Sequence, residues 1–85
     1  MCKLVIGVNK KPKNLAFNNY IRGQEKGLRE ENDGIGALIV DFDDNVKIFR
    51  SLSQYTAIFN KIYQNLDNAK FVSIHTRTGT SGLKD

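Results

Sequence analysis

Two apolar runs joined by a short acidic turn constrain the fold more than any other feature of this chain. Ile35–Phe42 is apolar apart from Asp41, and Val46–Phe49 resumes after the turn Asp43–Asn45. Asp and Asn favour turns because their side chains hydrogen-bond the nearby backbone and tolerate left-handed φ angles. Two β-type runs this close together predict a hairpin, so we expect an antiparallel pair of strands in the middle of the chain.

A β-type segment and a helical pattern lie on each side of this hairpin. Cys2–Asn9 predicts a first strand, and Asn14 is a suitable N-cap for a helix that runs to about Arg29. Ser51 and Gln54 have the spacing of a capping box, which predicts a second helix. Its apolar face has the i, i+3, i+4, i+7 spacing of a helix packed on a core, with Tyr55, Ile58, Phe59, Ile62, Tyr63 and Leu66.

The last predicted strand, Phe71–His75, places Phe71, Ser73 and His75 on one face. Thr76–Gly82 is rich in hydroxyl groups and glycine, which predicts a loop whose backbone approaches other groups closely. The order strand, helix, strand, strand, helix, strand predicts an α+β fold. We expect one domain over residues 1–85.

The composition excludes several classes of protein. No apolar run approaches the roughly 20 residues of a membrane span, and no secretory signal precedes the first strand, so we expect no membrane partner and a cytoplasmic protein. Cys2 alone makes no intramolecular disulfide, and with His75 as the one imidazole we expect no metal site and no cofactor.

The charge permits anionic partners without requiring them. Thirteen Lys and Arg against nine Asp and Glu leave a net charge of +4. Lys10, Lys11 and Lys13 flank Pro12 and predict a surface loop. A solvated connector is favoured for this basic loop, and a nucleic-acid site is the alternative.

Three residues are candidates for chemistry. Removal of Met1 would place the Cys2 thiol beside a free α-amine that can act as its base, although a single cysteine is often a buried hydrophobe. Arg77 is suited to bidentate capture of a carboxylate or phosphate, and a solvated surface arginine is the alternative. His75 is favoured as a strand residue satisfied by a neighbour rather than as an acid or base.

Two glycines precede the hairpin. Gly34 and Gly36 lie at the start of a strand, whereas the glycines of a dinucleotide fingerprint follow a strand and open a helix. We therefore interpret them as residues that permit a turn and close backbone packing.

Taken together, these features resemble class II glutamine amidotransferases, which are N-terminal-nucleophile (Ntn) hydrolases. The similarity comprises the opening Met1-Cys2, the Gly34-x-Gly36 pair before a strand, and the segment His75–Gly82. In order and approximate spacing it extends over all 85 residues. The resemblance implies an Ntn-hydrolase-like antiparallel sheet with flanking helices, as an incomplete αββα domain.

The resemblance also implies roles for individual residues. Cys2 would attack the side-chain amide of the substrate L-glutamine, giving a glutamyl thioester and ammonia, and Arg77 would hold the α-carboxylate. Thr78 and Thr80 would add contacts to the substrate. Four residues would support the site: Gly34, Gly36, His75 and Gly79.

The chain also departs from the family pattern. Lys3 stands where many members have Gly, Gly79 replaces Ala, and Thr78 occupies a position that is often aromatic. The family's oxyanion Asn-Gly pair and its acidic residue for the α-amine would lie beyond Asp85. We therefore expect the amidotransferase chemistry to be incomplete or inactive without a second polypeptide or a further C-terminal region. The alternative is a catalytically inactive, small basic protein that binds a protein or nucleic acid.

Overall fold

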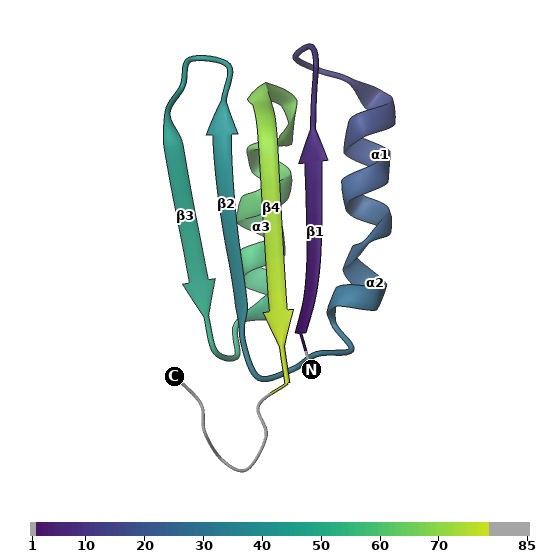
Figure 1. The fold of residues 1–85 in the computed structure, drawn as a ribbon, viewed down its shortest axis with the longest axis vertical. Coiled ribbons are helices and arrows are strands. Elements are labelled where there is room, and N and C mark those ends of the chain that lie inside the picture. The colour runs from purple at the N-terminus through teal and green to yellow at the C-terminus, as the bar shows by residue number, and fades with distance from the viewer. Residues whose placement is uncertain (1, 79–85) are drawn as a thin grey trace.

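The computed structural model describes residues 2–78, which form one antiparallel sheet with helices on one side (Figure 1). The strands are β1 (Cys2–Val8), β2 (Ile35–Asp41), β3 (Val46–Ser51) and β4 (Ala69–Arg77), in the spatial order β1-β4-β2-β3. Every neighbouring pair is antiparallel. The predicted α+β class, the central hairpin and the order of the elements are confirmed.

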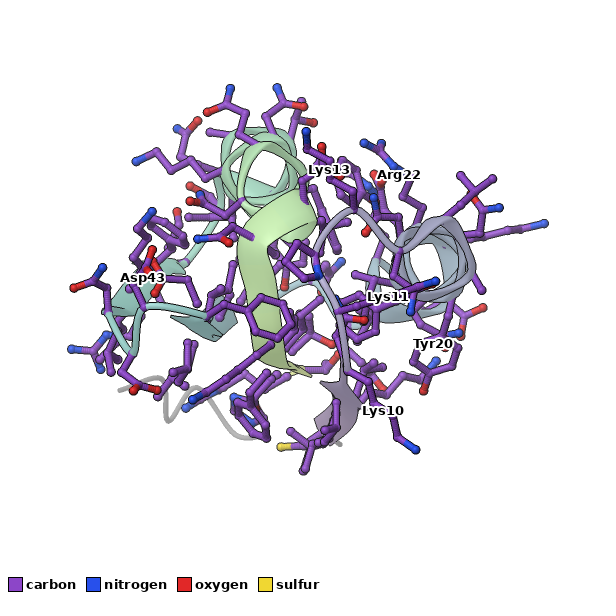
Figure 2. All side chains as sticks on the ribbon, turned by 90° about the horizontal axis from the view of Figure 1, so that it is seen from above. Lys10, Lys11, Lys13, Tyr20, Arg22 and Asp43 are labelled. Atoms are coloured by element: carbon purple, nitrogen blue, oxygen red, sulfur yellow. The ribbon has the colours of Figure 1, made fainter. Side chains whose placement is uncertain are left out.

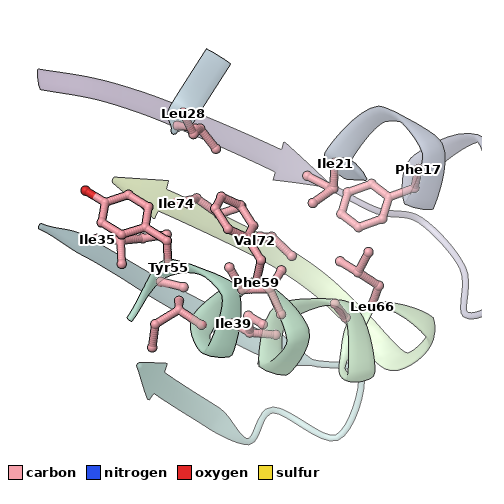
Figure 3. Packing of buried hydrophobic residues seen from close by; sticks show 14 residues of the cluster. Phe17, Ile21, Leu28, Ile35, Ile39, Tyr55, Phe59, Leu66, Val72 and Ile74 are labelled. Atoms are coloured by element: carbon pink, nitrogen blue, oxygen red, sulfur yellow. The ribbon is translucent and has the colours of Figure 1, made fainter. Parts of the chain in front are cut away.

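The helices cover one face of the sheet, as the view along the strands shows (Figure 2). They are α1 (Leu15–Gly23), α2 (Glu25–Leu28) and α3 (Tyr55–Gln64), followed by the 3₁₀ turn η1 (Leu66–Asn68). The core lies between this layer and the sheet (Figure 3). It consists of Phe17, Ile21, Leu28, Ile35, Ala37, Ile39, Tyr55, Ile58, Phe59, Ile62, Leu66, Ala69, Val72 and Ile74. The predicted apolar face of the second helix therefore packs on the core as expected, with Tyr63 half-buried at its border.

The first helical segment is divided. Asn14 is the N-cap as predicted, and its side-chain oxygen accepts a hydrogen bond from the Phe17 N–H at 3.3 Å. The helix, however, ends at Gly23 and a separate short helix follows, so one continuous helix to Arg29 is wrong. Gly23 and Gly27 each disfavour helix by about 1 kcal/mol relative to Ala, which weakens this stretch.

The capping box is also wrong. Helix α3 begins at Tyr55 with Gln54 at the N-cap position, and no side chain caps it. Ser51 is the last residue of β3, and its Oγ accepts hydrogen bonds from the N–H groups of Ser53 at 3.2 Å and Gln54 at 2.8 Å. Ser51 therefore stabilises the turn that leaves the strand, not the first turn of the helix.

Strand β4 is longer than predicted, because Thr76 and Arg77 belong to it and not to a loop. The Arg77 N–H donates to the Gly34 carbonyl at 3.0 Å, and the Arg77 carbonyl accepts from the Asp33 N–H at 2.8 Å. A strand paired on both sides keeps its backbone bonds to its last residue, whatever the turn propensity of the side chains. The rest of the predicted loop, 79–82, lies outside the described residues.

Within residues 2–78, no helix covers the second face of the sheet, which we call the open face. Cys2, at the start of β1, lies at one end of this face. The other end carries an apolar patch made of Ile6, Val8, Leu38, Val40, Val46, Ile48 and Phe71. Val8 is 73% exposed and Ile48 is 63% exposed. Among residues 2–78, no helix has the length and apolar character needed to cross a membrane.

Candidate functional site

Residues that the sequence singled out at the two ends of the described chain lie together at one end of the open face. Cys2 on β1 is directly opposite Arg77 on β4. His75 lies two residues before Arg77 on β4 and is opposite Gly36 on β2. Gly36 is in turn opposite Arg50 on β3. Because side chains alternate between faces with a period of two, these residues share the open face.

A hollow of about 520 Å³ lies at this end of the face. Strand β2 forms its floor, β4 one wall, and the end of β3 the other. The hollow is lined by Gly34, Ile35, Gly36, Arg50, Ser51, Leu52, His75 and Arg77. It therefore brings together four residues that the sequence placed near one site: Gly34, Gly36, His75 and Arg77.

The two glycines keep the floor of the hollow free of side chains. A Cβ atom at Gly34 would lie 3.4 Å from Cγ of Arg77, and one at Gly36 would lie 3.7 Å from Cγ of Arg50. These are van der Waals distances, so each arginine stem lies directly over a glycine. A larger side chain at either position would occupy the space between the two guanidinium-bearing chains.

Tyr55 fixes the backbone at the edge of this floor. Its hydroxyl oxygen lies 2.9 Å from the Gly34 N, which donates to it, and 2.5 Å and 2.7 Å from the carbonyl oxygens of Glu31 and Gly34. Burial raises the pKa of the Tyr55 hydroxyl, so the group keeps its proton and remains a donor. Tyr55 therefore links helix α3 to the turn that begins β2.

Cys2 lies outside the hollow, on the far side of β4. Two strand spacings separate β1 from the glycine floor on β2, which is about 10 Å. The cysteine is exposed and unpaired with another cysteine. The alternative of a buried structural cysteine is therefore wrong, and the thiol is accessible from the open face.

The remaining predicted site residues differ in their surroundings. The Thr78 hydroxyl donates to the carboxylate of Glu31, a buried residue beside the Tyr55 contact. The His75 side chain is exposed and makes no hydrogen bond within residues 2–78. Gly79 and Thr80 lie outside the described residues.

Four lining residues were not predicted as site residues from the sequence: Ile35, Arg50, Ser51 and Leu52. A signal was present, because Arg50 continues the alternation of Val46 and Ile48 on β3 and is a charged residue on an otherwise apolar face. It could be interpreted only once the strand register was known.

The basic loop is remote from this site. Lys10, Lys11 and Lys13 are exposed in the connection after β1, at the opposite end of the sheet from Cys2 (Figures 1 and 2). Lys13 is tied to the body of the protein through its N–H, which donates to the Asp67 carbonyl at 2.7 Å. Within residues 2–78, no three His, Cys, Asp or Glu side chains are grouped so as to hold a metal ion.

Comparison of the chain with protein-family models, with curated proteins and with solved structures finds no significant match in any of the three.

Proposed function

We propose that this protein carries the glutaminase chemistry of a class II glutamine amidotransferase, with Cys2 as nucleophile and Arg77 as the carboxylate-binding residue. The observation that supports this most directly is the cross-strand pairing of Cys2 with Arg77 beside the glycine-floored hollow. The Cβ atoms of opposed residues on neighbouring strands lie about 4.5–5.5 Å apart, and the Arg77 stem extends from this pair toward Gly34 on β2.

The reaction begins after removal of Met1. The α-amine of Cys2 accepts the thiol proton, and Sγ attacks the amide carbon of glutamine. Collapse of the tetrahedral intermediate breaks the C–N bond, and the protonated amine gives its proton to the leaving nitrogen, which departs as ammonia. Water then attacks the thioester, releases glutamate and restores the thiol. The sum is glutamine plus water to glutamate plus ammonia.

The apolar patch on the open face is consistent with the layered Ntn-hydrolase fold. Sheets with one apolar face pack against a second layer about 10 Å away. The exposure of Val8 and Ile48 marks where a second sheet, from a further region or another polypeptide, would be placed in an αββα arrangement. That layer would also supply the oxyanion donors, which are worth about 3–4 kcal/mol in the transition state.

A catalytically inactive binding protein is the second candidate. The same exposed patch favours it, since a contiguous apolar surface of this kind often marks a protein interface. In this case Cys2 would have no chemical role, and the patch would bind a protein partner.

Covalent labelling separates the two candidates. The protein is incubated with 6-diazo-5-oxo-norleucine, a glutamine-like electrophile, and its intact mass is measured beside that of Cys2→Ala. The enzyme proposal predicts loss of Met1 and an adduct equal to the reagent less dinitrogen, in the wild type alone. Retained Met1 without an adduct would contradict the amidotransferase proposal and favour the binding protein.

A further inference from the structure

The strand register arranges the side chains of the open face in rows that run across the whole sheet. Each row takes one residue from each strand, in the order β1, β4, β2, β3. The first row consists of Val8, Phe71, Val40 and Val46. The second row consists of Ile6, Ser73, Leu38 and Ile48. The apolar patch is therefore continuous from one edge of the sheet to the other, with Ser73 as its one polar neighbour within the two rows.

This patch is exposed in the isolated chain. Its members on the two edge strands are each more than half exposed: Ile6, Val8, Val46 and Ile48. The helices of residues 2–78 pack against the other face of the sheet, as Figure 2 shows. A contiguous apolar surface that crosses an entire sheet marks a surface that binds another molecule.

The charged side chains of the open face lie outside the two apolar rows. His75 and Arg50 are in the next row along the strands, opposite Gly36 on its two sides. An apolar centre with charged groups at its rim is the usual composition of a protein–protein interface. Two copies of this surface can therefore pack together without burying an unpaired charge, which would be costly.

The size of the open face matches what a pair of copies needs. Four strands spaced by about 4.8 Å, with β1 and β2 seven residues long at about 3.4 Å per residue, give about 450 Å² in plan. Two copies thus cover about 900 Å² before the relief of the side chains is counted. That relief takes the total past the roughly 1,000 Å² of a specific interface.

We propose that the open face binds a second copy of this chain, with the apolar patch of one copy packed against the apolar patch of the other about a two-fold axis. A two-fold pair uses the same surface on both copies, so one flat, uncharged patch is sufficient. Sheets that pack face to face lie about 10 Å apart, with their strands within about 30° of each other. The pair then has the αββα order of layers, formed by two chains.

This inference goes beyond the proposed function, because it names the polypeptide that forms the second sheet. It does not depend on the chemistry of Cys2. Cys2 and Arg77 lie two rows beyond the row of Ile6 and Ile48, at the rim of the paired surface. Dimer formation and covalent labelling are therefore separate observations.

Sedimentation equilibrium of the full chain tests the proposal. It is run over a range of micromolar concentrations with a reducing agent, so that the exposed Cys2 forms no disulfide between copies. We expect the mass to rise with concentration from that of the monomer to twice that value and no further.

Two variants place a charge on the patch from its opposite edges, Val8→Asp on β1 and Ile48→Asp on β3. Each should raise the dissociation constant of the dimer at least tenfold, because the carboxylate would be desolvated against the apolar patch of the other copy. Both side chains are more than half exposed in the isolated chain, so circular dichroism should show that the variants fold.

Leu15→Asp is the matched control. It makes the same change of charge at an apolar residue that is 71% exposed, but Leu15 lies on α1 and not on the open face. This variant should dimerise as the wild type does. Equal weakening in all three variants would show an effect of net charge and overturn the open face as the interface.

The remaining outcomes are also decisive. A wild type that stays monomeric, or a dimer that Val8→Asp and Ile48→Asp both leave intact, overturns the proposal. Assemblies larger than a dimer contradict a closed two-fold pair. A dimer weakened as expected, in a protein that the diazo reagent never labels, supports this inference while contradicting the amidotransferase proposal. Labelling of a protein that stays monomeric does the reverse.

Discussion

Cys2 and Arg77 are direct neighbours across strands β1 and β4 although they lie near opposite ends of the described chain. The sheet order places β4 between β1 and β2, so this pair lies beside Gly34, whose carbonyl accepts from the Arg77 N–H. A thiol, a guanidinium and a bare stretch of backbone are thereby brought to one end of the open face. The proposed chemistry depends on this register.

An engineered disulfide tests the register directly. Arg77→Cys should form a disulfide with Cys2 on mild oxidation, because opposed residues have Cα atoms about 4.5–5.5 Å apart, within the range of natural disulfides. Intact mass should fall by about 2 Da. His75→Cys is the control, since residue 75 is diagonal to Cys2 at about 7–8 Å. A disulfide formed more readily by His75→Cys would show that the strands pair in a different register.

The Tyr55 hydroxyl should contribute measurably to stability. Tyr55→Phe leaves the Gly34 N–H without its buried acceptor, so we expect a loss of about 1–3 kcal/mol in the free energy of unfolding. Urea denaturation followed by circular dichroism measures it. Tyr20→Phe is the control, because the Tyr20 ring is 48% exposed and its variant should match the wild type. Equal stability of both variants would mean that the Tyr55 contact contributes nothing.

Gly7 on β1 packs directly against helix α1. A Cβ atom there would lie 2.9 Å from Cε1 of Phe17 and 3.0 Å from Cδ1 of Ile21, two buried side chains of α1. Gly7→Ala should therefore destabilise the protein by about 1–3 kcal/mol through overpacking. Gly23→Ala, with nothing within 4 Å of the added atom, should be neutral or stabilising by up to about 1 kcal/mol. Thermal denaturation of the pair compares them, and the opposite ranking would contradict this packing.

The sequence predicted correctly those elements that depend on residues close to one another in the chain. The hairpin turn, the Asn14 cap and the apolar spacing of α3 each depend on residues within a few positions of one another. The length of β4 could not be predicted in this way, because Arg77 is held in the strand by backbone bonds to Asp33 and Gly34, more than 40 positions earlier. The hydroxyl- and glycine-rich composition of Thr76–Gly82 predicted a loop, but pairing with both neighbouring strands keeps Thr76 and Arg77 in β4.

In the candidate site, too, some residues could be recognised from the sequence and others only from the arrangement of the strands. Cys2, Arg77 and the glycine pair could be found because their residue types suggest chemistry or close approach. Arg50 could not, since a lysine or arginine on an edge strand is ordinary until the register places it opposite Gly36 and across from Arg77. Ser51 was misinterpreted for a related reason. Its spacing to Gln54 is that of a helix cap, but in the structure Ser51 ends β3 and its Oγ accepts from the Gln54 N–H in the turn that follows.

Asp41 gives the hairpin a predictable dependence on pH. Its Oδ1 accepts hydrogen bonds from the N–H groups of Asn45 and Asp43, both at 2.9 Å. These bonds, that from the Asn45 N–H first, lower the pKa of the Asp41 carboxyl below its ordinary value. A carboxyl with a lowered folded pKa stabilises the protein fully above its unfolded pKa of about 3.9, and this contribution is lost as the pH falls through the folded pKa.

Asp41→Asn removes the charge while keeping the shape of the side chain. We expect the variant to be less stable than the wild type at pH 7, and the difference to shrink as the pH falls below about 4. Urea midpoints at pH 7 and pH 3 measure this change. Asp43→Asn is the control, because the Asp43 side chain accepts no hydrogen bond within residues 2–78 and its substitution should not reproduce the effect. A difference between Asp41→Asn and the wild type that stays constant with pH would show that the ionised carboxylate does not stabilise this turn.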